Sequence, residues 1–213
     1  MKKELYKKIK AQIKGPVKNF LFIFVLTFVF IYFAFNFEVI YKNIKYEIEK
    51  RLPGKVNIIG EAAIIEVLKG GKEAKLTQDI IFIPKINVEA PIIIPKSNSK
   101  SDLLEALKNG VILRPDFSLP GENGITVIEG HSSPNLAGFG KYNSVFSLLG
   151  KLEYGDKIIV YYNKKEYKYK VIKKIIFKPE DDIQNIANKA DLFLVTCWPI
   201  GTNFKRIGIQ ARY

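Results

Sequence analysis

The sequence predicts a mostly β protein: a closed barrel of about eight strands with short helices, preceded by one N-terminal transmembrane helix. Three observations support this fold class. Aromatic residues, which favour strands, are abundant, with 15 Phe and 11 Tyr among 213 residues. From Ile80 onward, short apolar runs alternate with turns, as in barrels and sandwiches. One long apolar run lies near the N-terminus, and the remaining length suits a single domain.

The N-terminal part of the chain reads as a basic tail followed by a membrane span. Residues 1–19 contain seven lysines and one acidic residue, which is +6 of the net charge of +13. Phe20 to Phe35 contains no charge or polar face, and with its flanks is long enough to cross a bilayer. The residues that follow offer no small-x-small cleavage site, which favours a single-pass signal-anchor over residues 20–37. The lysines predict a cytoplasmic N-terminus and an extracellular remainder.

The basic charge is better explained by topology than by nucleic-acid binding. Nearly half of the excess lies beside the apolar run, and the remaining +7 suits an anionic cell envelope. Neither zinc-finger spacing nor an aromatic–basic RNA-binding signature occurs. One cysteine and one histidine fall short of the four ligands of a structural metal site. We therefore expect no nucleic-acid partner and no cofactor.

Residues 38–79 are expected to form a linker or N-terminal extension. Ile44 and Ile48 stand four residues apart among charges, which predicts a short amphipathic helix from Tyr41 to Leu52. Residues 55–79 are ambiguous: Ala62 to Leu68 fits a helix or a strand, and Gly70-Gly71 ends either one.

Residues 80–213 are expected to form the barrel domain. The predicted strands are Ile80–Ile83, Asn87–Ile94 broken by Pro91, Val111–Leu113, Ile125–Glu129, Lys157–Tyr162, Glu166–Phe177, Leu192–Thr196 and Lys205–Ala211. Two helices interrupt them. Asp102 is expected to cap the first, with Glu105 as reciprocal partner, and the second spans about Asp182 to Ala190. An Asn163-Lys164 turn joins two strongly patterned strands.

Three reactive side chains fall at the ends of predicted strands. His131 and Cys197, the only histidine and cysteine, each follow a strand, and Arg206 opens the last one. A nearby imidazolium stabilises a thiolate nucleophile, and His131 can later protonate a leaving amine. Arg206 stays charged and can hold an oxyanion. We therefore predict a catalytic site of these residues, with a buried inert thiol and an exposed histidine as the alternative.

Three residues near the thiol are candidate substrate-binding residues. Thr196 can hydrogen-bond substrate or position the thiol. Trp198 can wall a substrate groove, or it can pack on the barrel rim, and its backbone N–H can be a second oxyanion donor. Asn203, in the segment between Cys197 and Arg206, is the third.

These segments resemble sequences of the sortase family. Leu194-Val-Thr-Cys197 is similar to the Leu-x-Thr-Cys signature, and Cys197 to Arg206 is similar to the Cys-x-Pro-x-Gly-x-Asn-x-x-Arg form of class C and class D sortases. Gly130-His131 lies where the family's histidine loop would be. Other segments that resemble sortases are Ile83-Pro84-Lys85-Ile86, Pro120 to Gly124, Phe146 to Leu149 and Gly155-Asp156. The resemblance covers about residues 79–213.

The resemblance implies a sortase-type barrel and a membrane-anchored cysteine transpeptidase. Cys197 would attack the Thr–Gly bond of a Leu-Pro-x-Thr-Gly-like sorting signal on an exported protein. The thioacyl intermediate would then be resolved by an amine of a cell-wall precursor or by a pilin lysine. Class C sortases that assemble pili often carry an N-terminal lid with an Asp-Pro-aromatic motif and a second membrane helix near the C-terminus. Residues 38–79 contain no such motif, and no second apolar run follows Arg206. We therefore expect a class D-like or other single-anchor form.

The resemblance leaves calcium and two alternative functions open. Some sortases bind calcium near the loop before the cysteine strand, where Glu180, Asp181 and Asp182 offer carboxylates. A solvated helix N-terminus explains these acidic residues as well. The alternative functions are a thiol hydrolase of the same signal and a non-catalytic anchored β-domain that binds envelope components. A papain-like protease is disfavoured, because in those enzymes the cysteine precedes the histidine.

Overall fold

The structure is a computed structural model that describes residues 2–51, 78–134 and 140–213, with side chains from residue 19 onward. The chain divides into two compact units, Met1–Phe37 and Glu38–Tyr213. The predicted break at Gly70-Gly71 lies outside the described residues.

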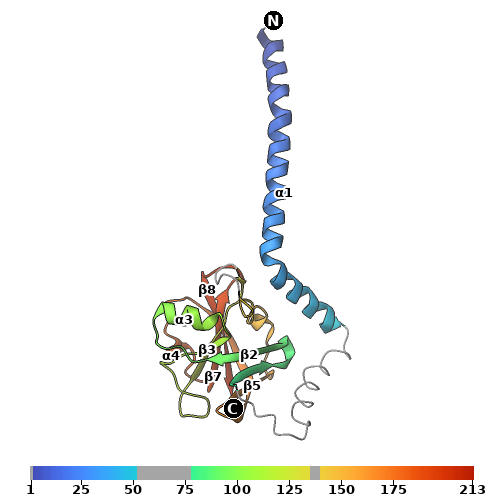
Figure 1. The fold of residues 1–213 in the computed structure, drawn as a ribbon. Helices are drawn as coiled ribbons and strands as arrows, with labels where there is room; N and C mark the ends of the chain where they lie inside the picture. The colour runs from blue at the N-terminus through green and yellow to red at the C-terminus, as the bar shows by residue number, and fades with distance from the viewer. Residues whose placement is uncertain (1, 52–77, 135–139) are drawn as a thin grey trace. The chain divides into compact units, whose positions relative to one another are not determined.

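Helix α1 runs from Lys2 to Arg51 and contains both the predicted membrane span and the predicted helix from Tyr41 (Figure 1). Its segment Asn19–Arg51 is long and apolar enough to cross a membrane, with a mean hydropathy of 2.4 in its most apolar part. The large side chains of this part are exposed, as Phe30 illustrates at 73%. An exposed surface of this kind is what a lipid-facing helix presents.

Eight strands close into a barrel, as the sequence predicted (Figure 1). The strands are β1 Ile80–Ile83, β2 Val88–Ile93, β3 Val111–Leu113, β4 Thr126–Glu129, β5 Lys157–Tyr162, β6 Lys165–Phe177, β7 Leu192–Trp198 and β8 Lys205–Arg212. Their order around the barrel is β1-β2-β3-β4-β7-β8-β6-β5. Two neighbouring pairs are parallel, β2 with β3 and β4 with β7, and the others are antiparallel.

Strand β2 continues through Pro91, where a break was expected. Pro91 pairs with Ile80 of β1, and the pairing of β2 with β3 begins only at the next residue, Ile92. The N–H of Ile92 donates to the Asp79 carbonyl on the β1 side, so the nitrogen of Pro91 points away from β1. A proline fits at this position because no ladder hydrogen bond is needed there.

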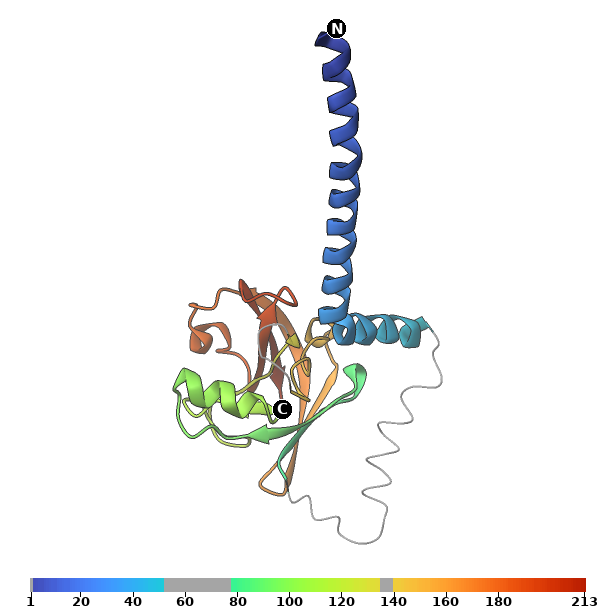
Figure 2. The ribbon, with the colours of Figure 1, turned by 45° about the horizontal axis from the view of Figure 1, so that its top comes forward.

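Two short helices, α3 Lys100–Leu107 and α4 Ile183–Ile186, lie outside the barrel (Figure 2). The predicted cap of α3 was wrong: the N-cap is Ser99, whose Oγ accepts from the Asp102 N–H at 3.2 Å. Asp102 lies in the first turn and accepts from the Ser97 hydroxyl instead. A serine suits the cap because its short hydroxyl reaches an unpaired N–H. Helix α4 starts where expected but is shorter than predicted.

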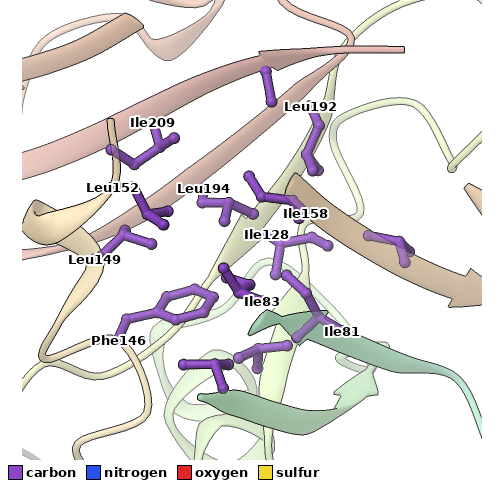
Figure 3. Packing of buried hydrophobic residues seen from close by; sticks show 14 of the residues in the cluster. Ile81, Ile83, Ile128, Phe146, Leu149, Leu152, Ile158, Leu192, Leu194 and Ile209 are labelled. Carbon is purple, nitrogen blue, oxygen red and sulfur yellow. The ribbon is translucent and has the colours of Figure 1, made fainter. Parts of the chain in front are cut away.

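Two apolar clusters lie on opposite faces of the central strands. The inner cluster fills the barrel and includes Ile81, Ile83, Ile128, Phe146, Leu149, Leu152, Ile158, Leu192, Leu194 and Ile209 (Figure 3). The outer cluster contains Val127, Phe177, Ala187, Phe193 and Val195. Because successive side chains of a strand point to opposite faces, β4 and β7 contribute alternate residues to the two clusters. Both strands are therefore held from both sides.

The end of α1, residues 38–51, belongs to the same compact unit as the barrel. Val39 is buried, and Tyr46 packs against the inner cluster. Lys151 Nζ lies 2.5 Å from Glu47 Oε1 and 5.5 Å from the centroid of the Tyr46 ring. The first part of the predicted linker over residues 38–79 thus packs on the barrel domain. Residues 52–77 lie outside the described part, and the role of the whole region stays a prediction.

The inner cluster predicts a sharp contrast between two leucines. Leu194 is fully buried in it, so Leu194→Ala removes packed methyl groups and should lower the free energy of unfolding by about 2–5 kcal/mol. Leu104 on α3 is 42% exposed, and Leu104→Ala should stay within about 0.5 kcal/mol of the native chain. Denaturant unfolding of the full chain in detergent, followed by circular dichroism, measures both. Equal losses would contradict the assignment of Leu194 to the core.

Candidate active site

The pairing of three neighbouring strands brings Cys197, His131 and Arg206 into one row. The parallel β4–β7 ladder pairs Glu129 with Val195, and the Gly130 N–H donates to the Val195 carbonyl at 3.1 Å. Extending this register by two residues, past the last ladder pair, places His131 opposite Cys197. On the other side of β7, Cys197 pairs directly with Arg206. Because neighbouring strands lie about 4.8 Å apart, the three residues are adjacent in space.

The Cys197 side chain belongs to the outer face of the barrel. It shares this face with Val195 and Phe193 of the outer cluster, since residues two apart point the same way. Leu194 and Thr196 point to the opposite, inner face. Cys197 is half-buried, so the structure does not place the thiol in the barrel core. The inert-core alternative for this cysteine is therefore disfavoured.

Thr196 links β7, the strand that carries the thiol, to the segment that precedes His131. Its side chain is buried, and its Oγ1 donates to the Gly130 carbonyl at 2.7 Å. This bond joins the residue before Cys197 to the residue before His131. The geometry supports the positioning role for Thr196, and its predicted contact with substrate stays a prediction.

His131 is half-buried and is held through its own backbone. Its carbonyl accepts from the Phe146 N–H at 2.8 Å. The preceding residue must be glycine, because a Cβ on Gly130 would lie 2.6 Å from the Phe146 ring. Gly130 and Phe146 together therefore determine where the chain carrying the imidazole can run.

Arg206 is held by the loop that precedes it. Its Nη1 donates to the carbonyls of Asn203 at 3.3 Å and Lys205 at 3.1 Å. The Asn203 side chain is exposed, so its substrate contact stays a prediction, while its carbonyl has the clear task of holding the guanidinium. Gly201 has a φ of 83°, a left-handed conformation that favours glycine in this loop.

Trp198 lies over the short 3₁₀ segment Leu149–Lys151. A Cβ built on Gly150 would lie 3.4 Å from Cζ3 of the indole, so the ring packs closely on that glycine. Trp198 is half-buried, and as the neighbour of Cys197 it points to the other face of β7. Packing of this kind is what the rim alternative expects. The groove role remains a prediction that a variant can test.

Burial favours the neutral forms of both reactive groups. It raises the pKa of the Cys197 thiol, an effect that Arg206 opposes and the Glu129 carboxylate reinforces. Burial also lowers the pKa of His131. Near neutral pH the thiol and the neutral imidazole therefore predominate, and the expected thiolate–imidazolium pair is the minor form. Proton transfer must accompany or precede nucleophilic attack.

Sequence reasoning missed Glu129 and Arg114, which lie beside this row. Glu129 shares the outer face with Cys197, and its Oε1 lies 3.3 Å from Arg114 Nη1. The pKa of the Glu129 carboxyl is raised above its usual value, mainly by burial, although the charges of Arg114 and Arg206 oppose this rise. The available signal was the spacing of two between Glu129 and His131, which places a charged residue on the face used by the histidine strand.

Two of the three acidic residues considered for calcium accept backbone hydrogen bonds. Asp182 caps α4 by accepting from the Gln184 N–H at 2.9 Å, and Asp181 accepts from the Lys178 N–H at 2.7 Å. Among residues 78–134 and 140–213, no group of three or more Asp, Glu, His or Cys side chains is arranged to hold a metal ion. The helix N-terminus thus accounts for Asp182, and calcium binding at these residues stays a prediction.

Known proteins resemble this chain over the barrel domain. Sortase D of Bacillus subtilis (strain 168) is 34% identical over 138 residues, which are 62% of each protein. The pilus-related sortase C of Group B Streptococcus is 28% identical with a TM-score of 0.50, covering 63% of this chain and 66% of that one. A sortase D5 transpeptidase of Clostridium perfringens is 25% identical with a TM-score of 0.50, covering 63% and 77%.

The sortase domain family itself matches residues 81–213, more than half of the chain. This range contains all eight strands except the first residue of β1, and it contains His131, Cys197 and Arg206. The chain therefore belongs to the sortase family.

Proposed function

We propose that this protein is a membrane-anchored cysteine transpeptidase. It cleaves a Leu-Pro-x-Thr-Gly-like sorting signal on an exported protein and transfers the product to an amine. The observation that carries this proposal is the pairing of Cys197 with Arg206 on β7 and β8, together with the β4–β7 register, whose extension through Gly130 leads to His131. A nucleophile, a proton carrier and a fixed cation at adjacent positions are the groups that acyl transfer through a thioester requires.

Each residue of the row has a defined task. Cys197 Sγ attacks the threonine carbonyl carbon, the thiol proton passes to His131, and the imidazolium protonates the departing glycine amine as the C–N bond breaks. In the second half, His131 accepts a proton from the incoming amine, which attacks the thioester and releases the thiol. Arg206 stabilises the oxyanion in both halves. The bonds that hold Arg206 use Nη1, and a guanidinium has five N–H donors, so it can be held and still donate to substrate.

The acceptor and the class are narrower parts of the proposal. The N-terminal helix supplies a single anchor, with the lysine-rich end in the cytoplasm and the barrel outside the cell. The 34% identity to a sortase D supports a class D-like enzyme. A cell-wall precursor amine is the acceptor that the resemblance to this class implies. A pilin lysine is the acceptor suggested by the likeness to a pilus-related sortase C.

The central test uses mass spectrometry of the full chain in detergent with a Leu-Pro-x-Thr-Gly peptide library, with and without an amine acceptor. We expect a thioacyl adduct on Cys197 that converts to ligated product when the amine is present. Cys197→Ala should form no adduct, and Ser101→Ala, an exposed change on α3, should behave like the native chain.

Other outcomes of this test separate the alternatives. An adduct that only hydrolyses with every amine tried indicates a hydrolase. A native chain that forms no adduct, and whose folded thiol also resists alkylation, would overturn the catalytic assignment and leave a non-catalytic envelope-binding domain.

The direction of the Cys197 pKa shift predicts the pH dependence of thiol reactivity. Because burial raises this pKa, the reactive thiolate should appear at a higher pH than in a free cysteine, whose pKa is about 8.5. Alkylation of the native chain by iodoacetamide should therefore rise through an inflection above that value. Arg206→Gln removes the charge that opposes the shift, so its inflection should lie higher still. An inflection below that of free cysteine would contradict the burial argument.

A variant of Trp198 distinguishes its two predicted roles. If the indole walls the substrate groove, Trp198→Ala should lower peptide turnover and leave the melting temperature nearly unchanged. If the indole only packs on Gly150, the melting temperature should fall while turnover per folded molecule is kept. Turnover of a labelled signal peptide and thermal unfolding on the same preparation give both numbers, with Phe204→Ala, which removes a 74% exposed ring in the same loop, as the matched control.

A further inference from the structure

The carboxylate of Glu129 lies two residues before His131, near Cys197 and Arg206. Glu129 pairs with Val195 in the β4–β7 ladder, and Cys197 is two residues further along β7 on the same face. Two residues along a strand and one strand across amount to a separation of about 8 Å between the two Cα atoms. The Glu129 side chain is only 23% exposed, so its charge is poorly screened by solvent.

The cation that pairs with Glu129, Arg114, also pairs with Asp116. Arg114 donates two hydrogen bonds to Asp116, Nε to Oδ1 at 3.0 Å and Nη2 to Oδ2 at 2.9 Å. Its contact with Glu129, from Nη1 to Oε1, is longer at 3.3 Å. A guanidinium that binds one carboxylate in this bidentate way neutralises the charge of a second carboxylate less completely. One cation facing two anions leaves this cluster with a net negative charge.

Cys197 therefore lies between charges of opposite sign. Arg206 is its direct partner on β8, and Glu129 is its neighbour on β4. His131, which follows β4, is the third titratable group beside the thiol. Glu129 in turn faces Arg114 from β3, Asp116 after β3, and Arg206 from β8. Among the described residues, these are the charged groups through which the surroundings act on the thiol.

We propose that Glu129 is a positioning residue of the active site, whose charge opposes Arg206 and keeps the Cys197 thiol largely protonated in the resting protein. The proposal deepens the proposed function, since it concerns the same thiol. Restraint of this kind keeps a half-exposed cysteine from reacting with small electrophiles. A substrate that covers Glu129 would favour its neutral carboxyl form, and the charge of Arg206 would then favour the thiolate without opposition.

A purely structural role for Glu129 makes a different prediction. If the carboxylate only anchors Arg114, its loss should lower the melting temperature without changing the acidity of Cys197. The two roles therefore separate in the pH dependence of thiol alkylation, which does not depend on any peptide substrate.

The test measures the rate of iodoacetamide alkylation of Cys197 in the full chain, from neutral to alkaline pH. Glu129→Gln keeps the size of the side chain and removes its charge. We expect its inflection to move to lower pH, with alkylation near neutral pH about three- to thirtyfold faster, as for one charge at about 8 Å between the bulk-water and near-surface dielectric limits. Glu129→Asp keeps the charge and should stay close to the native profile. Glu105→Gln removes a carboxylate paired with Lys108 on exposed α3 and should change nothing.

Two further measurements make the result decisive. Asp116→Asn frees Arg114 to neutralise Glu129, so it should shift the inflection in the same direction as Glu129→Gln, and it answers the question if the latter does not fold. A folded Glu129→Gln chain with an unchanged or higher inflection overturns the proposal. Ligation of the signal peptide, measured in parallel, separates the two hypotheses. An unchanged inflection with intact ligation refutes only the role of Glu129, and a shifted inflection without ligation in the native chain refutes only the transpeptidase.

Discussion

The parallel pairing of β4 with β7 is the constraint on which the rest of this molecule depends. It joins segments more than sixty residues apart in the wall of the barrel. Two bonds between Gly130 and the Val195–Thr196 segment continue it beyond the last ladder pair. A shift of one residue would turn every side chain of β7 to the other face and remove the thiol from the histidine. The two apolar clusters prevent this, because alternate residues of β7 are buried on each face.

The same packing sets the chemistry of the site. Cys197 lies two residues after Val195 of the outer cluster and is half-buried. Burial disfavours the charged forms of both the thiol and the imidazole. Two charged neighbours then act on the Cys197 pKa in opposite directions. Arg206 opposes the rise that burial causes, and Glu129 adds to it.

Much of this fold follows from local patterns. Strands β1, β3 and β5 begin and end where the sequence predicted. Turn-forming residues mark several of these ends, such as Pro84 after β1, Gly110 before β3 and Asn163 after β5. The Asn163-Lys164 turn has positive φ at both residues, as a tight hairpin requires. The predictions were wrong where contacts with another segment determine the local structure. Pro91 stays inside β2 because β3 pairs only after it, and Ser99 caps α3 because the helix starts earlier than the apolar residues suggested.

The sequence by itself determined the kinds of residue available for chemistry: one thiol, one imidazole and an arginine beside strand ends, with an apolar helix ahead of the barrel. These features follow from composition and short-range periodicity, which can be read within a single segment of the chain. Only the tertiary structure decided that the three residues lie side by side and that the Thr196 side chain points inward. It also decided that Trp198 packs on Gly150 and that Glu129 lies near the thiol. Each of these depends on the register between strands distant in sequence, and that register is set by how both faces of the barrel wall are packed.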